Sequence, residues 1–192
     1  MMDFLEELFS NTVVKMITAL MIVGMMSGAV LVMVYTSTKP SIARNLNRAR
    51  EQAIYSIFPG ADKIKDTSMD GVWEVKGKNG QLAGYAFRAE GNGYQGTIQM
   101  IAGVDRSFTT MRGMQVLESQ ETPGLGAEIA GKDFRSQFRD LQVSHQIEYV
   151  KNEKPVHPYQ IEAITGATIS SRAVVNILNR RMLEIKKNLK GN

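Results

Sequence analysis

The feature that most constrains this chain is an apolar run near its start, MITALMIVGMMSGAVLVMVY over residues 16–35, which contains no Asp, Glu, Lys, Arg or His. At about 1.5 Å per residue, a helix of about 20 residues crosses the roughly 30 Å hydrocarbon core of a bilayer. A buried core helix would usually show a polar stripe, and this run has none. A cleaved signal peptide fits poorly, because the run is too long and no A-x-A-like site follows it. The run therefore predicts an uncleaved anchor over residues 16–36, after a flank of residues 1–15.

Charges on either side of this anchor bear on its orientation. Basic side chains follow the anchor, whereas the preceding flank combines a lysine with acidic residues. The positive-inside rule taken alone therefore places the following domain in the cytoplasm. The rule is weak before a long domain, since long domains are translocated in spite of their charge. The residues concerned are Lys39, Arg44, Arg48 and Arg50 after the run, and Asp3, Glu6, Glu7 and Lys15 before it.

The absence of cysteine narrows the chemistry open to the rest of the chain. Disulfides, iron–sulfur clusters and thiol nucleophiles are excluded, so redox chemistry would need an organic cofactor or a metal. With only His145 and His157, a histidine-rich metal site is not expected, although the count leaves a carboxylate site open. The net charge of +4 is modest, and its C-terminal concentration is interpreted as a solvated helix face with no nucleic-acid partner.

Hydrophobic periodicity predicts the elements that follow the anchor. An apolar face at helical spacing indicates a connecting helix over residues 40–58, which begins near Pro40 and ends before Pro59-Gly60. Alternation at residues 72–76, the turn pair Asn79-Gly80 and a partner run at residues 81–89 indicate an antiparallel hairpin.

The second half of the chain predicts a further set of strands and helices. Together with the hairpin, they indicate a single α+β domain over residues 60–192, with a mostly antiparallel sheet and flanking helices. The expected elements are strands at residues 97–104, 111–118 and 143–150, a short helix at 132–138, and a C-terminal helix capped by Ser170 or Ser171.

A glycine-rich loop, Glu121-Thr122-Pro123-Gly124-Leu125-Gly126, lies between a predicted strand and a predicted helix. Pro123 restricts one backbone torsion, and Gly124 and Gly126 remove side chains, so that main-chain amides can approach a flat or anionic ligand. A turn without a ligand has the same composition, and the residues alone favour that plainer interpretation.

A second segment, Thr165-Gly166-Ala167-Thr168, runs into the C-terminal helix. Small residues leave the helix N-terminus open, and its unsatisfied amides and dipole favour a phosphate there. Thr168 would place a hydroxyl beside that phosphate. An ordinary capping segment explains the residues equally well, and a P-loop is excluded because its motif does not occur in the chain.

These segments in this order resemble the G subunit of Rnf electron-transport complexes. The resemblance rests on the apolar run, Gly93-Tyr94-Gln95-Gly96 before a buried strand, the ETPGLG loop and Thr165–Thr168, and it covers nearly the whole chain. The related C subunit of the Na⁺-pumping NADH:quinone oxidoreductase (Nqr) shares the pattern. Thr165–Thr168 is a weak signal alone, but it becomes specific together with the loop and the run.

The resemblance implies covalently bound flavin mononucleotide (FMN). In that family a flavin transferase moves FMN from FAD onto the last threonine of an [ST]GAT motif, which falls here on Thr168 as a phosphodiester. Thr165, Gly166 and Ala167 complete the motif, and the ETPGLG loop is expected along the flavin with Leu125 against the ring. The family usually has Asp where this chain has Glu162, a change that adds a methylene and keeps the charge.

The resemblance further implies an electron-transfer subunit of an Rnf-type ion-translocating ferredoxin:NAD⁺ oxidoreductase. Its expected partners are integral-membrane and iron–sulfur subunits, and a flavin transferase for maturation. The isolated chain is expected to be an electron carrier with no catalytic acid, base or metal, and His145 and His157 are expected to be structural.

The expected location is the cytoplasmic membrane, with a single span and the flavin domain on the outer face, against the local charge count. One alternative is an Nqr FMN subunit or another membrane flavoprotein. Another is a non-redox anchored binding or assembly module, in which TGAT is only a helix cap.

Overall fold

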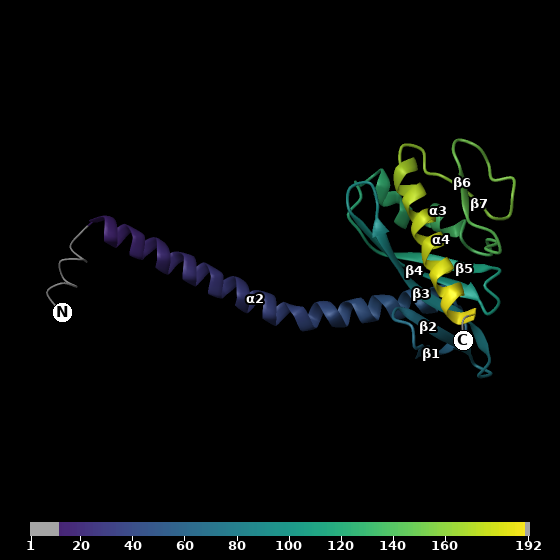
Figure 1. Ribbon diagram of the computed structural model, residues 1–192, viewed down its shortest axis with the longest axis horizontal. Helices are drawn as coiled ribbons and strands as arrows, with labels where there is room; N and C mark the ends of the chain where they lie inside the picture. Colours follow the sequence, from purple (N-terminus) through teal and green to yellow (C-terminus); the bar gives the residue numbers. More distant parts are fainter. Residues whose placement is uncertain (1–11, 191–192) are drawn as a thin grey trace. The chain divides into compact units, whose positions relative to one another are not determined.

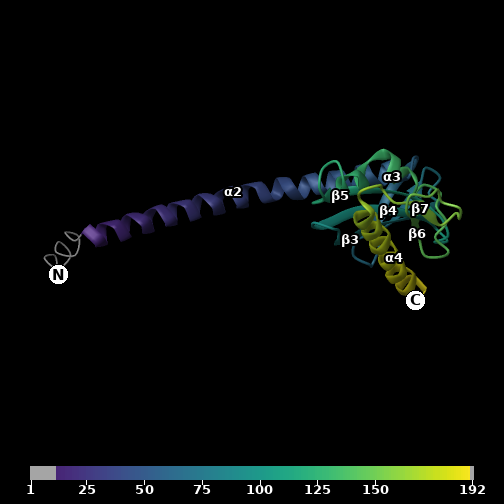
Figure 2. The same ribbon diagram turned by 90° about the horizontal axis from the view of Figure 1, so that it is seen from above.

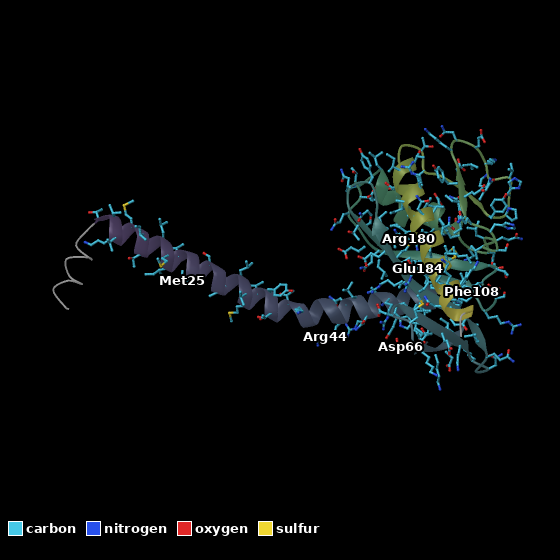
Figure 3. All side chains as sticks on the ribbon, viewed as in Figure 1. Met25, Arg44, Asp66, Phe108, Arg180 and Glu184 are labelled. Carbon is cyan, nitrogen blue, oxygen red and sulfur yellow. The ribbon has the colours of Figure 1, made fainter. Side chains whose placement is uncertain are left out.

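One long helix, α2 (Thr12–Ile57), opens the part of the chain that the computed structural model describes, residues 12–190 (Figure 1). Among these residues it is the only helix long and apolar enough to cross a membrane. No residue of its most apolar stretch is buried, and Leu20 and Leu31 are 72% and 71% exposed. Side chains stand out from the helix around Met25 (Figure 3). Such a surface suits a lipid environment far better than water.

Threonine hydroxyls within and beside the apolar stretch of α2 are satisfied by the helix itself. Thr18, Thr36 and Thr38 each donate to the carbonyl four residues earlier, at 2.8, 2.9 and 2.7 Å. These polar groups therefore need no water as a partner. The chain stays helical through residue 40, where the sequence predicts the start of a separate connecting helix. Residues 1–11 of the predicted flank lie outside the described residues, and the predicted divisions at 36, 40 and 60 stay predictions.

The second compact unit begins at Ala49 and contains a five-stranded antiparallel sheet in the order β1-β2-β3-β4-β5. Each strand pairs with the next along the chain, and the predicted hairpin at Asn79-Gly80 joins β2 to β3. Gly80 has a φ of 73°, and the amide of Gln81 donates to Asn79 Oδ1 at 3.1 Å. The strands are β1 (Ala61–Asp66), β2 (Val72–Gly77), β3 (Leu82–Asn92), β4 (Thr97–Asp105) and β5 (Met111–Ser119).

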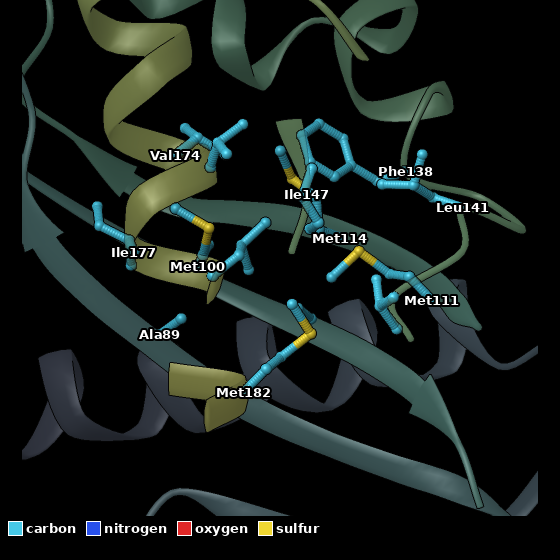
Figure 4. Packing of buried hydrophobic residues seen from close by; sticks show 14 of the residues in the cluster. Ala89, Met100, Met111, Met114, Phe138, Leu141, Ile147, Val174, Ile177 and Met182 are labelled. Atoms are coloured by element: carbon cyan, nitrogen blue, oxygen red, sulfur yellow. The ribbon is translucent and has the colours of Figure 1, made fainter. Parts of the chain in front are cut away.

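Alternate residues of the sheet enter two separate hydrophobic clusters, as the two-residue period of a strand requires. Phe87 and Met100 belong to the cluster that α4 (Thr168–Lys190) covers, and α4 packs on β3 (Figures 2 and 4). Ile101 belongs to the other cluster, with Ile54 from the last turns of α2. The predicted α+β class is confirmed, and the sheet is covered on both faces.

The predicted strand at residues 143–150 is wrong for most of its length. Only β6 (Glu148–Val150) is a strand, and it pairs in parallel with the unpredicted β7 (Gln160–Glu162). The cause is the side-chain amide of Asn179 in α4. It accepts from the amide of Ile147 at 2.9 Å and donates to the carbonyl of Ile147 at 2.8 Å. A helix side chain thus replaces a neighbouring strand.

Two further differences concern short elements. The edge strand β1 was not predicted, because its ADKIKD sequence is mostly exposed and charged, which is how natural proteins protect a sheet edge. The predicted helix at 132–138 is α3 (Lys132–Ser136), two residues shorter, and a 3-10 helix, η1 (Gly126–Ala130), precedes it.

Replacing Asn179 by Ala should weaken the domain, because both main-chain groups of Ile147 lose their partner. We expect the free energy of unfolding to fall by about 1–3 kcal/mol, the usual cost of an unsatisfied buried polar group. Thermal unfolding of the full chain in detergent measures this loss of stability. Asn176→Ala on the exposed side of the same helix is the control, and an equal loss of stability in both variants would contradict the assignment.

Candidate functional site

The carboxylate of Glu121 connects three segments that lie far apart in the sequence. Glu121 is 5% exposed. Its Oε1 accepts from the amides of Tyr94 at 2.7 Å and Gln95 at 3.0 Å, in the turn between β3 and β4. Its Oε2 accepts from the hydroxyl of Ser170 in the first turn of α4. One side chain of the ETPGLG loop therefore holds the β3–β4 turn and the N-terminus of α4 together.

These hydrogen bonds control the ionisation of Glu121. Burial, the largest influence, raises the pKa of the carboxyl, but hydrogen bonds from Ser170 and from the amides of Gln95, Tyr94 and Gly96 outweigh it. The pKa of Glu121 therefore lies below its ordinary value of 4.5. The group is a carboxylate at neutral pH, as a buried acceptor of several N–H and O–H donors should be.

Two glycines leave the space that this carboxylate occupies. A Cβ at Gly93 would lie 2.3 Å from Glu121 Oε1, and a Cβ at Gly126 would lie 2.5 Å from Oε2. Both distances are far below contact, so any side chain at either position would displace the carboxylate. The glycines of the loop and of the preceding turn thus serve the packing of Glu121, a reason that the sequence alone did not supply.

Thr168 is the first residue of α4, two and three residues before Ser170 and Ser171, which were predicted to cap this helix. That capping prediction is wrong, because both serine hydroxyls have other partners. Ser170 donates to Glu121, while Ser171 donates to the carbonyl of Ala167 at 3.0 Å and accepts from the amide of Ile164 at 3.0 Å. The serines therefore fix the segment before the helix, and Thr168 stands at its tip.

The tip of α4 offers unused donors. Within the described part of the chain, the amides of Thr168, Ile169 and Ser170 donate to no carbonyl, as expected for the first turn of a helix. The hydroxyl of the half-buried Thr168 likewise has no hydrogen-bond partner among the described residues. Free amides, the positive end of the helix dipole and a free hydroxyl together suit a phosphate group.

The ETPGLG loop reaches the TGAT segment directly. A Cβ at Gly166 would lie 3.4 Å from Leu125 Cδ2, so the leucine side chain rests on this glycine. The loop is held in place by its own backbone, since the amides of Leu125 and Ala127 both donate to the carbonyl of Thr122, at 3.2 and 3.0 Å. The structure therefore brings the two predicted motifs into contact.

Exposed apolar side chains surround this meeting point. Tyr94, Leu125 and Ile169 are 65%, 49% and 46% exposed, and each stands on one of the three segments that Glu121 joins. Exposed apolar groups beside polar donors are typical of a ligand site. Such a surface fits an aromatic ring system whose phosphate lies at the helix tip.

Positively charged side chains also lie on α4 near Thr168. A hollow of about 530 Å³ separates α4 from the end of β3, and its lining includes Ile169, Arg172 and Arg180 but no acidic residue. Arg172 follows Thr168 by one helical turn, so the two side chains share a helix face. The local field therefore favours an anion.

The remaining predicted site residues differ in their exposure. Ala167 is buried, whereas Pro123, Gly124 and Gly166 are exposed and Thr122 is half-buried. Thr165 is exposed and lines a different hollow, together with Glu162.

The two histidines lie on the surface, outside the three segments that Glu121 joins. Both are exposed, and their rings contact Tyr159, with centroid distances of 5.6 Å for His145 and 5.2 Å for His157. Among residues 12–190, no three His, Asp or Glu side chains come together in a way that could hold a metal ion.

Sequence reasoning missed the roles of Ser170 and of the Tyr94 and Gln95 amides. Glu121 and Ser170 are 49 positions apart, and no local pattern links them. The one available signal was the pair of glycines at 93 and 126, which indicates a close approach without saying of what.

Comparison with known proteins identifies the type of domain. Residues 93–182 match the FMN-binding domain family. The crystal structure of Shewanella oneidensis NqrC superimposes with a TM-score of 0.53 at 22% identity, over 64% of this chain and 65% of that one. The chain thus has the fold of the FMN-binding domain proteins.

Similarity over most of the chain identifies the family more closely. The G subunit of the ion-translocating oxidoreductase complex of Methanosarcina acetivorans is 33% identical over 180 residues, which is 88% of this chain and 93% of the relative. The G subunit of the proton-translocating ferredoxin:NAD⁺ oxidoreductase complex of Clostridium ljungdahlii is 29% identical over 85% of this chain and 86% of that one. The chain belongs to the family of G subunits of ion-translocating oxidoreductase complexes.

Replacing Glu121 by Gln should destabilise the domain in a pH-dependent way. Because the folded pKa is lowered, the carboxylate adds stability above the unfolded pKa and loses it as the pH falls through the folded pKa. We expect Glu121→Gln to lower the free energy of unfolding at pH 7 by about 1.5–3 kcal/mol, the usual value for hydrogen bonds to a charged group. The difference from the natural chain should shrink as the pH falls below 4.5.

Denaturant titrations of the full chain between pH 7 and pH 3 measure this difference. Glu128→Gln is the matched control, because Glu128 is an exposed acid in η1 whose carboxylate accepts no hydrogen bond from the described residues. A stability difference for Glu121→Gln that stays constant over this pH range would rule out the assignment of Glu121 as an ionised carboxylate that stabilises the fold.

Proposed function

We propose that this chain is the electron-transfer subunit that carries FMN in an ion-translocating ferredoxin:NAD⁺ oxidoreductase, with FMN joined to Thr168 by a phosphodiester. The observation that carries the proposal is the tip of α4, where a free threonine hydroxyl and three free amides lie beside the ETPGLG loop. Family membership supports the complex, and the matched domain supports the flavin.

The residues at the helix tip suit a phosphate ester. In the first turn, Thr168 places its oxygen next to the amides that would bind the remaining phosphate oxygens. Attachment would follow from transfer by a flavin transferase. The threonine oxygen forms a bond to the FMN phosphorus of FAD, the pyrophosphate bond breaks, AMP leaves, and the hydroxyl proton passes to solvent.

The protein groups around the tip would hold the flavin without reacting with it. FMN, when bound, supplies electron transfer in one- or two-electron steps. Leu125, Tyr94 and Ile169 provide apolar contact area, and Arg172 provides positive charge on the phosphate side. Glu121 is buried and fully engaged with protein donors, so its role is to position the loop. An ester through the phosphate leaves the ring unchanged, and packing around the ring would tune its potential.

Sequence similarity favours the Rnf type of complex over the Nqr type. The match with the Methanosarcina G subunit covers 93% of that relative, whereas the match with the C subunit of the Na⁺-translocating NADH-quinone reductase of Yersinia pestis covers only 43% of that relative. We therefore assign the expected partners as the membrane and iron–sulfur subunits of an Rnf-type complex. The chain is a carrier within that translocase.

Loss of the Thr168 hydroxyl should abolish covalent flavin. With a flavin transferase co-produced, a denaturing gel under ultraviolet light should show a fluorescent band for the natural chain and none for Thr168→Ala. The fold should be nearly unchanged, because the hydroxyl of Thr168 makes no hydrogen bond within the described residues. Ser68→Ala, which removes an exposed hydroxyl outside both motifs, is the control and should keep the band. Fluorescence that survives in Thr168→Ala would eliminate this attachment point.

We also propose that the flavin domain lies on the outer face of the cytoplasmic membrane. The chain has no cysteine, so a single introduced one is a unique label. In intact cells a membrane-impermeant maleimide should label Lys154→Cys on an exposed loop of the domain, and it should leave Ser10→Cys, before the span, unlabelled. The reverse pattern would place the domain in the cytoplasm, as the local charges indicate.

A further inference from the structure

A second cationic surface lies beside α3, apart from the flavin site. A hollow of about 470 Å³ is lined by Lys132, Arg135 and Arg139, together with the buried apolar residues Ile57 and Met114. No Asp or Glu is among its lining residues. We call it the α3 cationic hollow.

The three cations of the α3 cationic hollow lack counterions. Among residues 12–190, none of them forms an ion pair with a carboxylate. Arg135 donates through one terminal nitrogen to Gln115 Oε1, but its Nε is buried and has no acceptor. A buried donor without an acceptor costs free energy, so it marks a place where an oxygen ligand would bind favourably.

A neighbouring hollow extends the positive surface. It shares Ile57 and Arg139 with the α3 cationic hollow, and it adds Arg106 and Arg112. Its acidic residues are Asp105 and Asp140. The carboxylate of Asp105 is already engaged, since it accepts from the amides of Thr109 and Thr110 and from nearby hydroxyls. Positive charge therefore predominates over both hollows.

These cations could have a purely structural role if they bound the carbonyls at the end of α2. Basic side chains near a helix C-terminus often bind its last carbonyls, and α2 ends at Ile57 beside both hollows. Within the described residues, neither Lys132, Arg135 nor Arg139 donates to a carbonyl of α2. Hydrogen bonds to the end of α2 thus do not account for their arrangement.

We propose that the α3 cationic hollow binds an acidic segment of a neighbouring subunit of the complex. The inference rests on the proposed function, because it requires the chain to be a subunit. Lys132 and Arg139 are exposed, and the cations spread over two adjoining hollows with apolar residues between them. A protein surface that carries carboxylates fits this breadth, whereas a single small anion would occupy only one part of it. Complementary charge of this kind guides and orients association.

Charge reversal tests the assignment. The tagged full chain is co-produced with the other subunits of its complex and the flavin transferase, and it is purified in mild detergent. Lys132→Glu with Arg139→Glu should lower the retained subunits by about tenfold or more relative to the natural chain. The control, Lys151→Glu with Lys154→Glu, makes the same charge change on an exposed loop and should retain them. The covalent FMN band should persist in both variants, which shows that the flavin domain folds in each of them.

The outcomes separate the two proposals. If the natural chain retains no other subunits, the proposed function and this inference both fail. If the natural chain retains them and the Lys132/Arg139 variant does so equally, or if both variants lose them equally, only the docking site is refuted.

A zero-length carbodiimide cross-link provides a second readout. This reagent joins a lysine amine to a carboxylate, so phosphate groups of lipids give no product. Peptide mass spectrometry of the treated complex should find Lys132 joined to an Asp or Glu of another subunit, and Lys132→Arg should lose the link but keep the assembly. A Lys132 that is unlinked, or linked only within its own chain, would overturn the proposal.

Discussion

The buried carboxylate of Glu121 is the interaction on which the rest of the site depends. It accepts hydrogen bonds from the β3–β4 turn and from Ser170 in the first turn of α4, so two loops and a helix end are held by one side chain. Gly93 and Gly126 must lack side chains for the carboxylate to fit. Because these donors also keep its pKa low, the group stays charged and the connection stays strong at neutral pH.

The fold gives this connection a rigid support. The sheet is covered by α4 on one face and by the last turns of α2 on the other, and each face has its own hydrophobic cluster. The position of α4 is therefore determined by core packing over most of its length, and Glu121 fixes its first turn. Thr168 stands at a helix tip that is held from two sides while its hydroxyl and the adjacent amides remain free.

Local patterns in the sequence predicted the elements whose cause is local. The hairpin at Asn79-Gly80, the buried strands β4 and β5 and the C-terminal helix follow from turn chemistry and hydrophobic periodicity. The errors arise where a distant partner decides the structure. Residues 143–147 alternate like a strand, but Asn179 of α4 takes the main-chain bonds of Ile147.

The same distinction between local causes and distant partners applies to the candidate site. The structure brings the two predicted motifs into contact, and the resemblance carried by them predicted the family that the comparisons confirm. Helix rules anticipated free amides near Thr168. They could not predict that Ser170 binds Glu121, because a contact across 49 positions leaves no trace in spacing. The cations beside α3 also form no sequence motif, since Lys132, Arg135 and Arg139 meet Arg106 and Arg112 only through the fold.

Peptide mass spectrometry of the chain isolated from cells that make a flavin transferase tests most directly whether the tip of α4 holds the cofactor. Fragment ions should place an FMN group, joined with loss of water, on Thr168. A peptide of unmodified mass, or an FMN group located on Thr165 or on any other residue, would contradict this account of the site.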